Sequence, residues 1–197
     1  MWNAKPKGGY SFESGEALEN IRHIWQFFEL RGYTREAAAG VMGNIQAESG
    51  FNPWRWQGDK VNNSAGYGLF QFTPARGYLN ITGSKANKSV SCVTYDASPE
   101  DGRRQLEVFD DNELKKWTTL GWRPYWDSTK YGTLYAKSRF YIDEYASGRV
   151  KMSDLRKCTN IDAATFFVLA CFEGPAVPNF EIRAKFAHEI YNYLLTL

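Results

Sequence analysis

The sequence predicts a mainly α-helical domain with long insertions and at most a small β-hairpin. Apolar residues recur at helical spacing along most of the chain, and one such segment is rich in small residues that suit a central helix. A single stretch rich in glycine, proline, asparagine and tryptophan interrupts the pattern. Because 197 residues can bury one sizeable core, we expect an N-terminal tail at residues 1–14 and one domain at residues 15–197.

Two helices are predicted in the first quarter of the chain. Residues 16–30 carry an apolar stripe that ends before Gly32, a residue suited to a left-handed helix stop. Thr34 can cap a second helix at residues 35–49, whose alanines and glycines allow close contact with other helices. We therefore expect the second helix to be deeply packed. The stripe of the first helix consists of Leu18, Ile21, Trp25 and Phe28.

The remaining elements follow from turn residues and helical spacing. Residues 50–65 are expected to form a loop, and residues 67–72 a short extended segment of the hairpin. Two Thr-Pro or Ser-Pro pairs place a capping residue before a proline, which is typical of a helix start. The further helices are predicted after Thr73-Pro74, from Ser98-Pro99 to about Trp117, and at about residues 133–147, 160–173 and 179–195.

Composition narrows the classes of ligand. Lysine and arginine (24) nearly balance aspartate and glutamate (22), and the net charge of +2 does not favour nucleic-acid binding. Aromatic residues make up 16% of the chain, which is more than a core of this size needs. Flat ligands such as sugars therefore become candidate partners.

No cofactor, metal ion or membrane span is expected. The sequence has no run of about 18 apolar residues and no apolar stretch near its start that could serve as a signal peptide. Cys92, Cys158 and Cys171 are too few for a disulfide framework, and Cys171 is expected to pack in the core. His23 and His188 lie in separate helical segments without metal-ligand spacing.

Glu48 is the strongest candidate for chemistry. It falls in register with Ala38, Val41 and Ile45, so it ends the apolar stripe of the second helix. A carboxyl group that is half-buried at a helix C-terminus is favoured in its protonated form and can donate a proton. A helical glutamate more usually points into solvent, and periodicity alone does not decide between the two interpretations.

The loop after Glu48 carries side chains that suit a sugar ligand. Residues 50–57 include Asn52, Trp54, Trp56 and Gln57. Aromatic faces stack on sugar rings, and side-chain amides bond to hydroxyl and acetamido groups. One of the two tryptophans is instead expected to pin the loop to the core.

Residues 66–71 form a second block of this kind. Two glycines flank Tyr67 with flexible backbone positions. Alternation along an extended segment places Gln71 on the same face as Leu69. If this segment borders a cleft, Gln71 can reach into it.

Cleavage of a sugar bond commonly needs a second carboxylate, and Asp59 and Glu173 are the candidates. Asp59 lies in the loop, where a mobile, solvated aspartate is the alternative. Glu173 ends a predicted helix, and its alternative is a buried ion pair with Arg183 or Arg55. The sequence has no glycine-rich phosphate loop, GxSxG or HExxH motif, and no convincing pair of nucleophile and base.

Several sequence blocks together resemble the phage tail lysozyme family. These blocks are residues 43–49 (GNIQAES), Asn52-Pro53 and residues 66–75 (GYGLFQFTPA). Residues 172–179 (FEGPAVPN) are similar to the family's late aromatic-Glu-Arg-Pro-Ala block, so the resemblance covers most of the chain from the first helix onward. Gly174 stands where that block often has arginine, so a contact made by that arginine cannot be transferred to this chain.

The resemblance implies a mainly α-helical, lysozyme-like fold of the α+β kind, with a helical bundle around a central helix and a small β-hairpin beside a glycan-binding cleft. It also implies a set of site residues. The helix-ending Glu-Ser and the later Gly-Leu-Phe-Gln are also similar, more distantly, to signatures of goose-type lysozymes and lytic transglycosylases. Glu48 then matches the catalytic acid, and residues 67–71 match the strand that lines the sugar cleft. The substrate-binding residues expected on this basis are Ser49, Asn52, Trp54, Gln57, Tyr67, Gln71 and Asn179.

The function implied by the resemblance is that of a muramidase, which cleaves the β-1,4 bond between N-acetylmuramic acid and N-acetylglucosamine in peptidoglycan. Such proteins sit on phage tails and open the cell wall for genome delivery. The expected partners are therefore glycan strands and other tail proteins, with no nucleic acid or membrane, and the expected location is the virion. The alternatives are a lytic transglycosylase, in which Glu48 serves as acid and then as base, and a glycan-binding module without activity.

Overall fold

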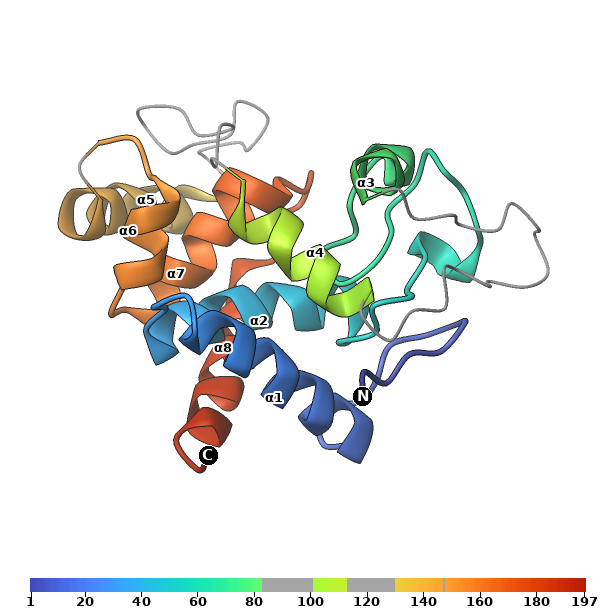
Figure 1. Cartoon of the computed structure of the whole chain (residues 1–197). Helices are drawn as coiled ribbons and strands as arrows, with labels where there is room; N and C mark the ends of the chain where they lie inside the picture. The colour runs from blue at the N-terminus through green and yellow to red at the C-terminus, as the bar shows by residue number, and fades with distance from the viewer. Residues whose placement is uncertain (83–100, 113–129, 147) are drawn as a thin grey trace. The chain divides into compact units, whose positions relative to one another are not determined.

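The structure, a computed structural model, describes residues 1–82, 101–112, 130–146 and 148–197 (Figure 1). These residues are mainly helical, and no β-strand is assigned among them. The chain divides into two compact units, Met1–Phe27 with Ile45–Asp111 and Phe28–Asn44 with Asn112–Leu197. The expected partition into a tail and one domain stays a prediction.

Helices α1 (Gly15–Glu29) and α2 (Arg35–Ser49) lie where the sequence predicts them. Gly32 follows α1 with a left-handed φ of 74°. Thr34 caps α2, because its hydroxyl accepts a hydrogen bond from a backbone N–H of the first turn at 3.0 Å. Residues 37–45 are all buried, which confirms the deep packing expected of α2.

The helices described in the second unit confirm three predicted segments and add one. The additional helix, α6, has six residues and is therefore too short to show a helical period. The helix predicted at residues 160–173 begins as α7 and ends in a π-helical turn. The bounds are α5 (Gly132–Tyr145), α6 (Met152–Lys157), α7 (Ile161–Val168), its π-helical continuation (Leu169–Glu173) and α8 (Phe180–Leu194).

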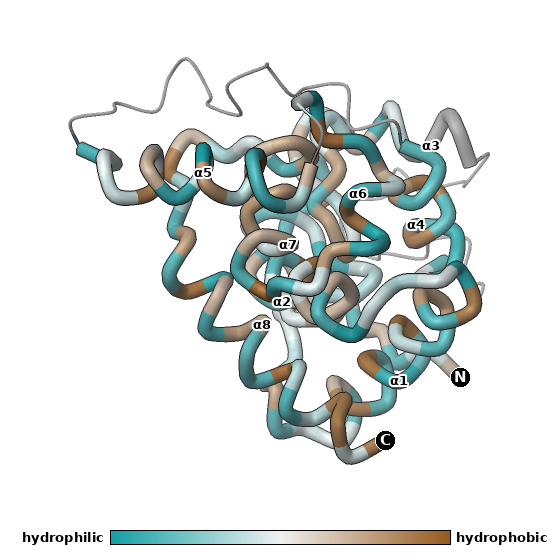
Figure 2. Tube along the Cα trace, turned by 90° about the vertical axis from the view of Figure 1, so that its left-hand side faces the viewer, coloured by the Kyte–Doolittle hydropathy of each residue, from teal (hydrophilic) through white to brown (hydrophobic). Residues whose placement is uncertain are grey.

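In this second unit α2 approaches α7 and α8 closely because two of its positions are glycine. A Cβ atom on Gly40 would lie 2.6 Å from the Thr165 backbone nitrogen, and one on Gly43 would lie 2.9 Å from the Ala187 backbone nitrogen. Figure 2 shows hydrophilic and hydrophobic stretches alternating along α8, as expected of a helix that buries one stripe. The small residues noted in the sequence therefore serve helix packing.

The first unit holds a 3₁₀ turn (Gln57–Asp59), α3 (Ala75–Thr82) and α4 (Asp101–Asp110). Helix α3 begins directly after Thr73-Pro74, as predicted. The Ser98-Pro99 start proposed for α4 lies outside the described residues. Helix α4 ends at Asp110 and not near Trp117, so the predicted helix was too long.

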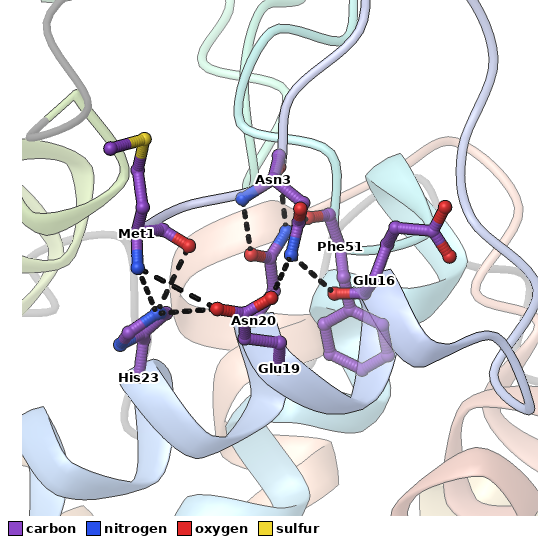
Figure 3. A network of polar contacts seen from close by, with 7 residues as sticks. All are labelled: Met1, Asn3, Glu16, Glu19, Asn20, His23 and Phe51. Atoms are coloured by element: carbon purple, nitrogen blue, oxygen red, sulfur yellow. Dashed lines mark hydrogen bonds and ion pairs between the residues drawn. The ribbon is translucent and has the colours of Figure 1, made fainter.

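Within the first unit, a buried asparagine holds the N-terminal segment in place (Figure 3). Asn20 is fully buried, and its side chain accepts a hydrogen bond from the Asn3 N–H and donates to the Asn3 carbonyl, both at 2.8 Å. The same amide donates to the Phe51 carbonyl at 2.8 Å. Asn20 thus links the start of the chain to the loop that follows α2.

Two further sequence predictions concern cysteines and membranes. Cys171 is buried, which confirms its packing role, and Cys158 is also buried. Cys92 lies outside the described residues. In the part of the chain that the structure describes, no helix is long and apolar enough to span a membrane.

Candidate functional site

Glu48 is half-buried in the last turn of α2. The helix ends immediately after it, because Gly50 and Phe51 have left-handed φ angles of 56° and 59°. Ser49 is buried, and its hydroxyl donates to the Ile45 carbonyl of the previous turn at 3.0 Å. The carboxyl-bearing residue is therefore followed by a sharp change of chain direction into the predicted sugar-binding loop.

The backbone at this turn is fixed by the N-terminal segment. The Tyr10 N–H donates to the Gly50 carbonyl at 2.8 Å. A Cβ atom on Gly50 would lie 2.8 Å from the Gly9 Cα atom, so the two glycine backbones are in direct contact. The position of the chain after Glu48 thus depends on residues near the start of the sequence.

Asn52 is fully buried and uses its amide within the protein. The amide nitrogen donates to the Lys5 carbonyl at 2.8 Å and to the Gly8 carbonyl at 2.7 Å. The amide oxygen accepts from the Trp54 N–H at 3.0 Å. Direct contact of Asn52 with a sugar stays a prediction, and these hydrogen bonds favour a supporting role.

The two tryptophans of the loop differ in burial. Trp56 is fully buried, and its ring centroid lies 4.8 Å from that of Tyr67. Trp54 is half-buried and packs at the edge of the same aromatic cluster. The expectation that one tryptophan pins the loop to the core is therefore confirmed for Trp56, whereas Trp54 keeps exposed surface.

The segment predicted to be an extended strand is a tight turn. Tyr67 and Phe72 exchange backbone hydrogen bonds of 3.2 and 2.8 Å, and Gly68 and Gln71 between them have φ angles of 80° and 46°. Regular alternation does not continue through residues with left-handed φ, so the placement of Gln71 on the face of Leu69 was wrong. The paired residues form isolated β-bridges, Trp56 with Tyr67 and Tyr67 with Phe72.

Gln71 and Gln57 both support this turn. The Gln71 amide nitrogen donates to the Arg55 and Gly68 carbonyls, each at 3.0 Å. The exposed Gln57 accepts a hydrogen bond from the Gly66 N–H at 3.0 Å. Substrate contacts by either glutamine stay predictions.

Asp59 is ion-paired, in contrast to the mobile, solvated side chain considered above. Its carboxylate lies 3.1 Å from Arg55 Nε and accepts a hydrogen bond from the Gly8 N–H at 2.7 Å. The pair is about one-third exposed to solvent, so its contribution to stability is small. Asp59 as second catalytic carboxylate stays a prediction.

Glu173 and Asn179 belong to the second unit. Glu173 is the last residue of the π-helical turn, and Gly174 ends the turn with a φ of 55° and an N–H that donates to the Leu169 carbonyl at 2.7 Å. Such turns are frequent at functional sites. Asn179 is exposed, with a left-handed φ of 46°.

The arginines proposed as partners of Glu173 have other polar contacts. Arg55 pairs with Asp59, and the buried Arg183 donates from Nη1 to Asn44 Oδ1 at 3.0 Å. A salt bridge of Glu173 with either arginine stays a prediction, as does its catalytic role.

Asp101 is a buried carboxyl group that the sequence reading missed. It accepts hydrogen bonds from the Tyr67 hydroxyl at 2.6 Å and from the Tyr78 hydroxyl at 2.7 Å. Burial raises the pKa of Asp101, and the hydrogen bonds from the tyrosines and from Gln105 oppose part of this effect. The sequence pattern does not mark it as buried, because its two tyrosine partners come from distant parts of the chain.

The arrangement agrees with the lysozyme-like class that the sequence motifs imply: a half-buried glutamate ends a buried helix, and a tryptophan-bearing loop follows it. Residues 19–194 match the family described as phage tail lysozyme, and the chain belongs to this family. The chain is also 46% identical over 66 residues to Morphogenesis protein 1 of Bacillus phage B103. That match covers 33% of this chain and 18% of the phage protein, so the chain spans about a fifth of this curated relative.

Proposed function

We propose that this protein degrades peptidoglycan as a muramidase and that Glu48 is the general acid. Membership of the phage tail lysozyme family supports a lysozyme-like activity. The observation that carries the residue assignment is the half-buried position of Glu48 at the end of α2, directly before the loop that presents Trp54. A carboxyl group placed in this way can meet a glycan that stacks on the indole.

In the proposed reaction Glu48 protonates the glycosidic oxygen between N-acetylmuramic acid and N-acetylglucosamine while that bond breaks. The oxygen leaves as a hydroxyl group, and positive charge develops on the muramic acid ring. Water then adds to the anomeric carbon and loses a proton to a second base. Asp59 and Glu173 are the proposed candidates for this base, and the glycan lies in a cleft bordered by residues 67–71.

The first alternative is a lytic transglycosylase. In that reaction the muramic acid 6-hydroxyl attacks the anomeric carbon, and Glu48 acts as acid and then as base. The second alternative is a glycan-binding module without turnover. The family and the partial match to a phage morphogenesis protein support a phage-associated protein. We further propose that it sits on the phage tail and opens the host wall there.

The test of the proposed acid is Glu48→Gln, which keeps the shape of the side chain but cannot deliver a proton. Positioned acid catalysis contributes about 10²- to 10⁴-fold, so we expect wall lysis to fall by at least about 100-fold. Glu29→Gln is the matched control, because Glu29 is exposed in the last turn of α1. A Glu48→Gln variant that keeps more than half of the parental activity would contradict the assignment.

Mass spectrometry of the products separates the enzymatic alternatives. Hydrolysis adds one water to each cleaved bond, whereas transglycosylation yields an internal anhydro ring and products lighter by one water. Binding to intact peptidoglycan without any soluble product would support the module without activity.

A further inference from the structure

Gln105 on α4 joins the two sequence blocks of the proposed sugar-binding loop. Its side chain is fully buried, and its amide oxygen accepts a hydrogen bond from the Leu69 N–H at 2.6 Å. Its amide nitrogen donates to the Pro53 carbonyl at 2.8 Å. One side chain therefore holds the backbone of both the first block (residues 50–57) and the second block (residues 66–71).

The contact between Gln105 and the loop leaves no free space. A Cβ atom on Gly68 would lie 2.7 Å from Gln105 Cδ, and Gly68 has a left-handed φ of 80°. The loop backbone thus rests directly on the amide group. Any displacement of this amide shifts the turn that contains Leu69.

Asp101, one helical turn before Gln105, completes this arrangement. Its carboxylate accepts from the Gln105 amide nitrogen at 3.0 Å and from the Tyr67 hydroxyl at 2.6 Å. Gln105 is therefore oriented by Asp101, and the second block is held at its backbone by Gln105 and at a side chain by Asp101. The two blocks also bond to each other, because the Gly68 N–H donates to the Arg55 carbonyl at 2.7 Å.

We propose that Asp101 and Gln105 are positioning residues that set the affinity of the loop for the glycan. They touch Pro53 and Tyr67 to Leu69, which flank the half-buried Trp54 and form the proposed border of the cleft, and they touch no reacting group. This inference rests on the function proposed above. In this proposal α4 positions the loop for substrate binding. The described residues of the loop form isolated β-bridges, and α4 supplies the support that a regular sheet would otherwise give.

The main test is Gln105→Met in the full chain, which keeps the length of the side chain and removes its hydrogen bonds. A small misplacement of binding groups has large kinetic effects, so we expect KM for soluble glycan strands to rise about tenfold while kcat changes less than about twofold. Asp101→Asn is the milder variant and is expected to change KM in the same direction. Glu107→Gln is the matched control on α4, because Glu107 pairs with the exposed Arg103, and it is expected to leave both constants unchanged.

A second measurement keeps this proposal separable from the proposed function. In the Glu48→Gln background, the fraction of protein that sediments with insoluble peptidoglycan is compared with and without Gln105→Met. If the parent protein sediments but releases no product, the muramidase proposal fails. Weaker sedimentation with Gln105→Met then still supports the positioning role.

The positioning role is overturned if Gln105→Met and Asp101→Asn melt at a lower temperature than the parent protein but keep its KM and its sedimentation. A parent that neither releases product nor sediments overturns both proposals.

Discussion

The substitution Asn52→Asp tests whether Asn52 supports the loop or contacts the substrate. It changes one group of a fully buried side chain and keeps its shape. In the native protein the amide nitrogen donates to the Lys5 and Gly8 carbonyls at 2.8 and 2.7 Å. A carboxylate oxygen in this place accepts and does not donate, so both carbonyls lose their donor and face another acceptor.

The magnitude follows from these two lost hydrogen bonds. A buried acceptor left without a donor costs about 1–3 kcal/mol, so the free energy of unfolding is expected to fall by about 2–6 kcal/mol. At roughly 2–4 °C per kcal/mol for a chain of this size, the melting temperature falls by at least about 4 °C. Burial favours the neutral carboxyl group, which can donate one hydrogen bond, so the loss is smaller near about pH 4 than near about pH 7.

The assay is thermal unfolding followed by circular dichroism, with Asn63→Asp as the matched control. Asn63 is exposed in the same loop, and its substitution is expected to change stability by less than about 0.5 kcal/mol. Tryptic cleavage after Lys7 should also become faster in Asn52→Asp, because this substitution releases the N-terminal segment. The reasoning is refuted if Asn52→Asp melts like the parent and loses only its binding to peptidoglycan, since Asn52 would then contact the glycan directly.

Two further predictions concern backbone space and pH. Gly40→Ala should lower the free energy of unfolding by about 1–3 kcal/mol, because the new Cβ atom would lie 2.6 Å from the Thr165 backbone nitrogen. Gly77→Ala in α3 meets open space and should raise the free energy of unfolding by about 0.5–1 kcal/mol. Urea unfolding measures both changes. Because burial raises the pKa of Asp101, its ionisation costs stability as the pH rises through the folded pKa, so the stability deficit of Asp101→Asn relative to the parent should narrow between about pH 4 and pH 7. A deficit that widens over this range would show that the tyrosine hydrogen bonds outweigh burial.

Helices with a continuous apolar stripe could be predicted from the sequence, and strand alternation could not. The bounds of α2 agree with the prediction because its cap and its small residues are all local features. The spacing of Leu69 and Gln71 also looks like a local feature, but it arises in a turn whose Gly68 and Gln71 have left-handed φ. A period of two over so few residues does not distinguish a strand from such a turn.

In the candidate site, too, the features set by local sequence could be predicted and those set by distant contacts could not. The helical period places Glu48 at the end of a buried stripe, and the structure has it half-buried at that point. Asp101 could not be found in this way, because its hydroxyl partners lie 34 and 23 residues before it in the chain. The sequence around it, with Glu100, Arg103 and Arg104, is charged and suggests a solvated helix start. Contacts between segments that are distant in the sequence therefore determine the surroundings of Asp101.

The burial of the predicted sugar-contact residues implies two distinct roles within the first unit. Asn52 and Tyr67 are fully buried with their polar groups bonded to other residues, and the Gln71 amide nitrogen holds two carbonyls of the turn. Glu48 and Trp54 are half-buried and keep surface that a glycan can reach. Substitution of Asn52, Tyr67 or Gln71 should therefore act first on stability and loop position. Substitution of Glu48 or Trp54 should act on turnover or affinity in a protein that remains folded. The loop thus depends on a buried polar scaffold for the placement of a small number of accessible groups.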